Sequence, residues 1–276
     1  MDDSEDISAI SIQELYGHAW ATGEEFSARL DRSLRPRGPE MLYDRASVLG
    51  LGEGDRALDL GCRDARHACE LASRFGCRVV AIDPVERNVA RARELVEGRG
   101  LTDRVSVATG GMESIPCSDG ELDFIWCRDV TNHVANLASG FRECARVLRP
   151  GGRMLLYQTF STSLLEPEEA ARLYAWTATN PRNMCREAFV FALAGSGLRI
   201  EDHDIVSSAW RERAAEDGHP HTARQLLRIA RIRRDRDRLV AEFGRTAVDA
   251  EMGDCLWGVY QMLGKLCPMV YVIVRE

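Results

Sequence analysis

The sequence lacks the features that mark a membrane or secreted protein. No apolar run is long enough to cross a bilayer, and the acidic opening MDDSEDISAI has no basic segment followed by an apolar one. The nine cysteines include no CxxC pair, and several lie within apolar segments. We therefore expect a cytoplasmic protein whose cysteines are reduced and mostly buried, with no metal site.

A basic surface is also missing. The formal net charge is −7 at pH 7, whereas a surface that binds nucleic-acid phosphates usually appears as a basic domain. Proline and glycine gather in no long tract, and no internal repeat is visible, which excludes a fibrous or globally disordered chain. The 276 residues, 45% of them hydrophobic, predict one globular domain with appendages and no nucleic-acid partner.

The middle of the chain alternates short β-branched runs with helical patterns. Strands separated by helices of this length imply right-handed crossovers and an α/β fold, with a parallel sheet covered on both faces. The five candidate strands lie at residues 56–62, 78–84, 105–111, 122–128 and 153–160. The helical patterns between them lie at 67–76, 86–100 and 138–152.

The alternation loosens after residue 165. Two further strands are expected near the end of the chain, and the helical patterns around them are less regular. The expected strands are 198–206 and 269–276, and the expected helices are 166–178, 186–197 and a long basic region at 221–243. Residues 7–50 are expected to be largely helical, with a break at Pro36 and Pro39.

Ligands of an open parallel sheet bind beyond the carboxyl ends of its strands, so the residues that follow each strand are the first candidates. LDLGCRDARHA, residues 58–68, begins like a nucleotide-binding turn, but Arg63 and Ala65 stand where small residues are expected. Asp83 ends the second strand about 20 residues past this turn, a spacing that suits hydrogen bonds from ribose hydroxyls.

Four segments, in order, resemble the class I S-adenosylmethionine-dependent methyltransferases, in particular the small-molecule branch of the ubiquinone and menaquinone methyltransferases. The segments are LDLGC, AIDP, SIPCSDGELDFIWC and FRECARVLRPGGRMLLY. The resemblance covers roughly residues 45–162. It implies a Rossmann-like, doubly wound, mostly parallel seven-stranded sheet, with S-adenosylmethionine as cofactor and S-adenosylhomocysteine as its product.

The resemblance also implies an organisation and a set of cofactor-binding residues. We expect a helical cap at 1–50, a cofactor-binding Rossmann-like core at 51–165, and the rest of the sheet with inserted substrate-covering helices at 166–276. Asp83 is expected to hold the ribose. Glu113 is the candidate substitute for an acidic residue that the family usually carries where this chain has Gly111. The candidates are Asp59, Gly61, Cys62, Arg63, Asp83, Pro84, Met112, Glu113 and Cys127.

Two interpretations of Arg63 stay open. A methyltransferase binds no pyrophosphate, so its backbone need not approach the ligand as closely as in a dinucleotide loop, and the need for glycine is weaker. Arg63 is then either a surface arginine tolerated in a turn or a clamp on the carboxylate of the cofactor.

The catalytic candidates follow the fourth strand. In the layout that the resemblance implies, Asp129 lies near the transferred methyl group, as a base or as a stabiliser of positive charge, unless it forms a structural ion pair with Arg128. His133 is the second candidate, because an unperturbed pKa of about 6.5 suits proton removal near neutrality; the alternative is that it caps a helix.

Aromatic residues outside the sheet suggest an apolar substrate pocket, although each of them also fits a place in the core. The substrate-binding candidates are Tyr16, Trp20, Arg128, Tyr174, Trp176 and Trp210. The basic region 221–243 is either a solvated, salt-bridged face or a contact for a phosphate-bearing substrate. Residues 256–272, with Trp257 and Tyr260, are either core or an oligomer contact.

Together these features predict methyl transfer from S-adenosylmethionine to oxygen or carbon of a small-molecule acceptor in specialised metabolism. Two alternatives stay open: C-methylation of an isoprenoid alkene, with cyclisation driven by the cation, and a protein of this fold that binds the cofactor without transferring methyl. The expected partner is the small-molecule acceptor, with no membrane span; a homo-oligomer is left open.

Overall fold

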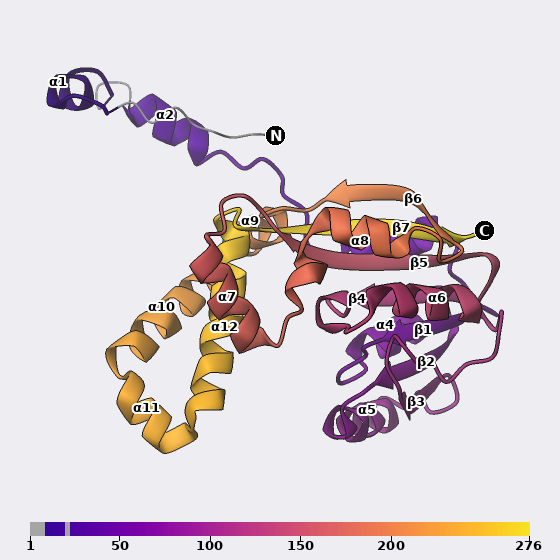
Figure 1. The fold of residues 1–276 in the computed structure, drawn as a ribbon. Coiled ribbons are helices and arrows are strands. Elements are labelled where there is room, and N and C mark those ends of the chain that lie inside the picture. Colours follow the sequence, from indigo (N-terminus) through magenta and orange to yellow (C-terminus); the bar gives the residue numbers. More distant parts are fainter. Residues whose placement is uncertain (1–8, 20–22) are drawn as a thin grey trace. The chain divides into compact units, whose positions relative to one another are not determined.

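The computed structural model describes residues 9–19 and 23–276, and the chain divides into two compact units, Met1–Pro36 and Arg37–Glu276 (Figure 1). The first unit holds α1 (Ile12–Glu14), a π-helical turn (Leu15–Ala19) and α2 (Gly23–Leu30). A capping box between Ser11 and Glu14 begins α1. Tyr16 lies in this unit with 67% of its surface exposed, and Trp20 lies outside the described residues.

The second unit is built on a seven-stranded sheet of order β3-β2-β1-β4-β5-β7-β6. All neighbouring strands pair in parallel except β7, which is antiparallel to both β5 and β6. The prediction of a mostly parallel seven-stranded sheet is confirmed. Its strands are β1 (Arg56–Leu60), β2 (Arg78–Asp83), β3 (Val105–Thr109), β4 (Leu122–Arg128), β5 (Leu148–Ser161), β6 (Leu198–Ile205) and β7 (Leu266–Arg275).

Helices cover both faces of the sheet, as the strand and helix alternation predicts. One apolar layer contains buried residues of α3 (Met41–Val48), α4 (Arg66–Phe75) and α5 (Glu86–Gly98). The other contains α6 (Leu137–Val147) and α8 (Arg186–Leu193). Along β1, Ala57 belongs to the first layer and Leu58 to the second, because successive side chains of a strand point to opposite faces.

The helix predicted at 138–152 is shorter than the sequence pattern suggested. It ends at Val147, and β5 begins at Leu148. Pro150 has no N–H for a helix and disfavours helical backbone at the preceding residue. At Gly152 a Cβ atom would lie 2.9 Å from the carbonyl oxygen of Arg149, so this tight turn requires glycine.

A second helical group follows β5 and is inserted before β7. It comprises α7 (Pro167–Thr177), a 3₁₀ turn (Pro181–Met184), α9 (Ala209–Glu216), α10 (His221–Arg234), α11 (Arg236–Phe243) and α12 (Arg245–Met262). The basic region 221–243, read as one helical stretch, is two helices with a break at Asp235. Trp257 and Tyr260 pack in the apolar cluster between α7, α10 and α12, which supports the core interpretation over an oligomer contact.

All nine cysteines are free, and most of them are buried, as predicted; Cys185 is exposed. Within the described residues, no helix is long and apolar enough to cross a membrane.

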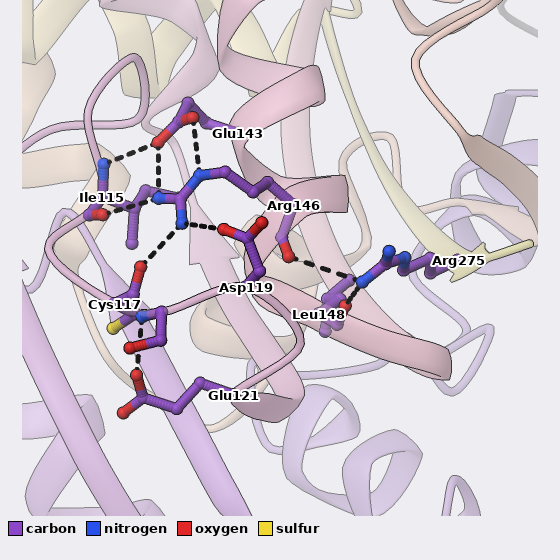
Figure 2. A network of polar contacts seen from close by, with 9 residues as sticks. Ile115, Cys117, Asp119, Glu121, Glu143, Arg146, Leu148 and Arg275 are labelled. Atoms are coloured by element: carbon purple, nitrogen blue, oxygen red, sulfur yellow. Dashed lines mark hydrogen bonds and ion pairs between the residues drawn. The ribbon is translucent and has the colours of Figure 1, made fainter.

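Arg146 joins two of the segments on which the family resemblance rests (Figure 2). Its Nε and Nη2 donate to the two carboxylate oxygens of Glu143, at 2.9 Å each. The remaining N–H groups donate to the carbonyl oxygens of Ile115 and Cys117 and to Asp119, at 2.8–2.9 Å. All five guanidinium donors are thereby used, and the loop that leads from β3 to β4 is held against α6.

We expect Arg146→Ala to lower the free energy of unfolding by about 2–4 kcal/mol, because carbonyl oxygens and a carboxylate lose a charged donor. Arg146→Lys is expected to recover little of this loss, since an ammonium cannot reproduce the fork. Urea unfolding measures both. Arg149→Ala is the control: its side chain is 53% exposed and pairs mainly with Asp123, so its loss is expected to stay below about 1 kcal/mol. Equal losses for the two alanine variants would contradict the assigned role of Arg146.

Candidate cofactor and acceptor site

The strand order reverses direction at β1, which has β2 on one side and β4 on the other. The connections that leave these strands therefore open toward opposite faces and leave a crevice at the carboxyl edge, where open α/β sheets bind their ligands. Three candidate segments meet at this edge: the turn after Leu60, the residues around Asp83, and the stretch that begins at Arg128.

The turn after β1 has the backbone of a glycine-rich loop although it contains one glycine. Gly61, Arg63 and Ala65 have φ values of 73°, 52° and 58°, all in the left-handed region. Gly61 and Cys62 both donate their N–H to the carbonyl oxygen of Ile82, at 2.9 and 2.8 Å, so the turn is fixed to β2. A side chain at Gly61 would overlap Val130.

Asp83 lies where the turn meets the end of β2, and only 6% of its surface is exposed. Its Oδ2 accepts the backbone N–H of Arg63 at 3.0 Å. Its Oδ1 accepts the N–H of Val85 at 2.9 Å and the side-chain amide of Asn88 at 3.0 Å. A carboxylate has about four acceptor positions, so three bonds fix its orientation and leave capacity for a hydroxyl donor.

Asp59 is a second carboxyl group in this region, but it lies inside the sheet. It is 2% exposed, and its Oδ2 accepts the N–H of Ala68 at 2.9 Å, in the first turn of α4. Burial raises the pKa of Asp59 to about 7. This group ties β1 to α4.

The residues expected at the adenine edge surround the start of α6. Met112 is buried, and Gly140 leaves it room, because a Cβ atom there would lie 2.8 Å from Met112 Cγ. Glu113 accepts the N–H of Asn136 at 2.9 Å, so it connects this loop to the N-terminus of α6. Pro84 is exposed beside Asp83. The adenine roles of these residues stay predictions.

Three side chains that are far apart in sequence form a polar chain behind the site. Arg128 Nη1 lies 3.2 Å from His67 Nε2, and His67 Nδ1 lies 2.7 Å from the hydroxyl oxygen of Tyr43. Arginine can only donate, so Nε2 must be the acceptor and the proton of a neutral His67 must lie on Nδ1. Burial, together with the charge of Arg128, lowers the pKa of His67 to about 4 and keeps the ring neutral.

Arg128 therefore has a different partner from the one considered in the sequence analysis. No ion pair joins it to Asp129 in the described part of the chain; instead its guanidinium lies over two aromatic rings, 5.2 Å from the centroid of Trp210 and 5.6 Å from that of Tyr157. These rings stack on each other at 4.4 Å. Tyr157 is 3% exposed and lies opposite Arg128 at the end of β4, and both rings pack in the first apolar layer; we call this pair the aromatic wall.

Asp129 directly follows β4 in a left-handed conformation, with φ at 54°. Its N–H donates to the carbonyl oxygen of Tyr157 at 3.0 Å, and the hydroxyl of Thr159 donates to its Oδ1 at 3.2 Å. Burial raises the pKa of Asp129 to about 6, while the charges of Arg128 and His133 act in the opposite direction. The group is thus an ionised carboxylate at neutral pH with one oxygen not bonded to Thr159.

His133 is exposed in the 3₁₀ turn Thr131–His133. Its Nδ1 lies 3.0 Å from the carbonyl oxygen of Ala178, so this nitrogen carries the proton and Nε2 is free to accept one. The contact connects the loop after β4 to the end of α7.

The structure separates the aromatic candidates into two groups. Trp210 is part of the wall, and its indole N–H donates to the sulfur of Met41 at 3.4 Å. Tyr174 and Trp176 instead pack in the apolar cluster around α12, where Arg236 lies 5.9 Å from the Trp176 ring. Sequence reasoning missed Tyr43, His67 and Tyr157; His67 stands within LDLGCRDARHA, but its partners are distant in sequence.

Residues 58–156 match the family described as methyltransferase domain. They contain the turn, Asp83 and the loop after β4. Residues 58–156 therefore form a methyltransferase domain. The recognition of that family from sequence motifs is confirmed, and the narrower likeness to ubiquinone and menaquinone enzymes stays a prediction.

Two curated relatives show how far the sequence likeness extends. The chain is 35% identical over 120 residues to "Methyltransferase GfsG" of Streptomyces halstedii, covering 44% of this chain and 42% of that protein. It is 30% identical over 165 residues to "24-methylenesterol C-methyltransferase 2" of Oryza sativa subsp. japonica, covering 59% and 46%. The matches span less than half the length of these relatives.

The fold likeness extends over nearly the whole chain. The crystal structure of the [4+2]-cyclase SpnF matches with a TM-score of 0.66, covering 98% of both chains at 19% identity. At this identity the match shows a common fold.

We expect Arg63→Gly to raise the free energy of unfolding by about 0.5–1 kcal/mol. A left-handed backbone costs an L-residue roughly 1–2 kcal/mol, and glycine removes this cost. Part of the gain is offset because glycine has more conformational freedom to lose when the chain folds. Thermal and urea unfolding measure the change. Arg91→Gly, on the exposed side of α5, is the control and is expected to lose about 1 kcal/mol. A loss of similar size at Arg63 would show that its side chain makes contacts that outweigh the strain.

Proposed function

We propose that this protein transfers the methyl group of S-adenosylmethionine to a small-molecule acceptor. The observation that carries the proposal is the carboxylate of Asp83, oriented by three donors beside a turn whose backbone is that of a nucleotide-binding loop. The methyltransferase family of residues 58–156 supports it.

The residues at the carboxyl edge fit this cofactor. Asp83 would accept a hydrogen bond from a ribose hydroxyl, and the exposed Pro84 and half-exposed Val85 offer an apolar surface beside it for the adenine. The backbone of Gly61 and Cys62 would face the methionine end. The bound cofactor supplies an electrophilic methyl group on a sulfonium centre.

Asp129 provides the base that a hydroxyl acceptor needs. Its Oδ1 is held by Thr159, which leaves Oδ2 to take the proton of the acceptor hydroxyl as that oxygen becomes the nucleophile. Alignment of the acceptor with the methyl group supplies much of the remaining rate increase, on the order of 7–11 kcal/mol in favourable cases. Arg128, held by His67, stabilises the ionised form of Asp129.

Methylation of an alkene is less well supported by the site. A carbocation intermediate needs free aromatic faces, whereas the guanidinium of Arg128 already lies over Tyr157 and Trp210. The third possibility is cofactor binding without methyl transfer; a protein described as a [4+2]-cyclase, SpnF, shares this fold. Calorimetry with S-adenosylmethionine and mass spectrometry of products made with labelled cofactor distinguish the three.

Several finer expectations remain part of this proposal. They are a role in specialised metabolism, a cytoplasmic location, a possible homo-oligomer and the absence of a nucleic-acid partner. The covering helices α7 and α9–α12 would set the choice of acceptor.

Asp83→Asn is expected to raise the calorimetric Kd for S-adenosylmethionine roughly 10- to 100-fold, since a hydrogen bond to a charged group contributes about 1.5–3 kcal/mol. Asp64→Asn is the control, because Asp64 lies in the same turn but pairs with the exposed Arg66. Unchanged affinity in Asp83→Asn, or no binding by the wild-type protein, would overturn the cofactor assignment.

The pKa of Asp129 predicts the pH dependence of turnover. A base with a pKa of about 6 is active above that pH, so kcat/KM should fall as the pH drops through 6. Asp129→Asn should abolish this fall of kcat/KM below pH 6, which is the acidic limb of the pH profile, and it should lower the rate about 10²- to 10⁴-fold. Both are measured with labelled cofactor on an acceptor that the wild-type protein methylates. Asp103→Asn, on the exposed surface, is the control. If His133→Gln removes the limb and Asp129→Asn does not, His133 is the base.

A further inference from the structure

We propose that Arg211 binds an anionic group, a carboxylate or a phosphate, on the acceptor of the methyl group. This inference rests on the proposed function and specifies the class of its substrate. Arg211 follows Trp210 on α9, the helix that supplies one ring of the aromatic wall, and its charge acts on the candidate base Asp129.

Two buried glutamines fix the position of Arg211. Its Nε donates to Gln261 Oε1 and its Nη1 to Gln225 Oε1, both at 3.1 Å. Gln225 and Gln261 are 5% and 6% exposed, and they come from α10 and α12. Gly258 on α12 makes room for this arrangement, because a side chain there would overlap the carboxamide of Gln225. Three helices therefore hold one guanidinium in place.

The glutamines orient the charge of Arg211 but do not neutralise it. Within the described chain, no carboxylate lies within ion-pair distance of its guanidinium, although the residue is partly buried. A guanidinium has five N–H donors, and the hydrogen bonds found for Arg211 use Nε and Nη1. The Nη2 group is left to bind a partner. A partly buried charge without an ion-pair partner is unfavourable, and a bound anion would reduce that penalty.

The groups whose charges act on Arg211 include the residues proposed to contact the acceptor of the methyl group. Burial lowers the pKa of Arg211, the nearby Arg128 lowers it further, and Tyr157, Asp254 and Asp129 raise it. Arg211 therefore shares its surroundings with the base, the aromatic wall and a second cation. His221, whose pKa is lowered by burial and by Arg211, also faces it.

The unused donors of Arg211 favour an anion. Within the described chain, neither Arg128 nor Arg211 forms an ion pair; the charge of Asp129 acts on both, and that of Asp254 acts on Arg211 as well. A planar guanidinium with fixed donors suits the paired oxygens of a carboxylate or phosphate.

A purely structural role would give Arg211 a different signature. An arginine that only joins α9 to α10 and α12 would affect stability when replaced, and it would have no effect on anion binding. The two roles are therefore separated by a binding measurement on folded protein.

The test titrates inorganic phosphate and succinate into the wild-type protein, Arg211→Gln and Arg213→Gln, at constant ionic strength set with chloride. Binding is read by calorimetry and by the thermal unfolding midpoint, with and without saturating S-adenosylhomocysteine. Arg213 lies on the same helix but pairs with Asp217 and is 50% exposed, so its variant is the control.

We expect the wild type and Arg213→Gln to bind at least one of the two anions, and Arg211→Gln to bind it at least tenfold more weakly. If Arg211→Gln does not fold, Arg211→Lys replaces it, with an expected weakening of at least threefold because an ammonium lacks the paired donors. Equal anion binding by the wild type and the Arg211 variant would overturn the proposal, as would no anion binding by the wild type. Failure of S-adenosylhomocysteine to bind the wild type would instead count against the proposed function. Because anion binding is also measured without this compound, the two failures can be distinguished.

Discussion

The site depends on the parallel pairing of β1 with β2 on one side and with β4 on the other. Leu60 lies opposite Ile82 and Cys127 in the two ladders, so the residues that follow these three strands meet at one edge. The Ile82 carbonyl oxygen then accepts two N–H groups of the turn after β1, which fixes the turn to the strand that carries Asp83. A shift of one residue in either ladder would turn these groups to the opposite face.

Backbone strain gathers at this edge. Arg63, Ala65 and Asp129 adopt left-handed conformations that L-residues seldom occupy, and they lie in the connections that follow β1 and β4. Such conformations persist only where the surroundings determine them strongly. Here the turn is bonded to Ile82 and Asp83, while the N–H of Asp129 is bonded to the neighbouring strand at Tyr157. The strain therefore accompanies a rigid arrangement of the two carboxylates that the proposed function uses.

The two arginines of the acceptor region, Arg128 and Arg211, are held by uncharged hydrogen-bond partners. Neutral His67 accepts a hydrogen bond from Arg128, and two glutamines accept hydrogen bonds from Arg211. Within the described residues, neither arginine forms an ion pair with a carboxylate. Asp129 feels both cations without a direct ion pair. This keeps its carboxylate ionised at neutral pH in spite of burial, and it connects the choice of base with the choice of acceptor.

The sequence by itself determined the sheet, the family of its core and the position of Asp83. Strand periodicity and the Gly and Pro positions act over a few residues, which is why β4 was predicted with its observed bounds, whereas Pro150 ended α6 earlier than the pattern suggested. Only the tertiary structure decided which side chains meet. Arg128 contacts His67 across 61 positions, and Arg211 contacts Gln261 across 50, so no local pattern could show them. These contacts depend on strand register and on helix packing, which are fixed only when the whole chain folds.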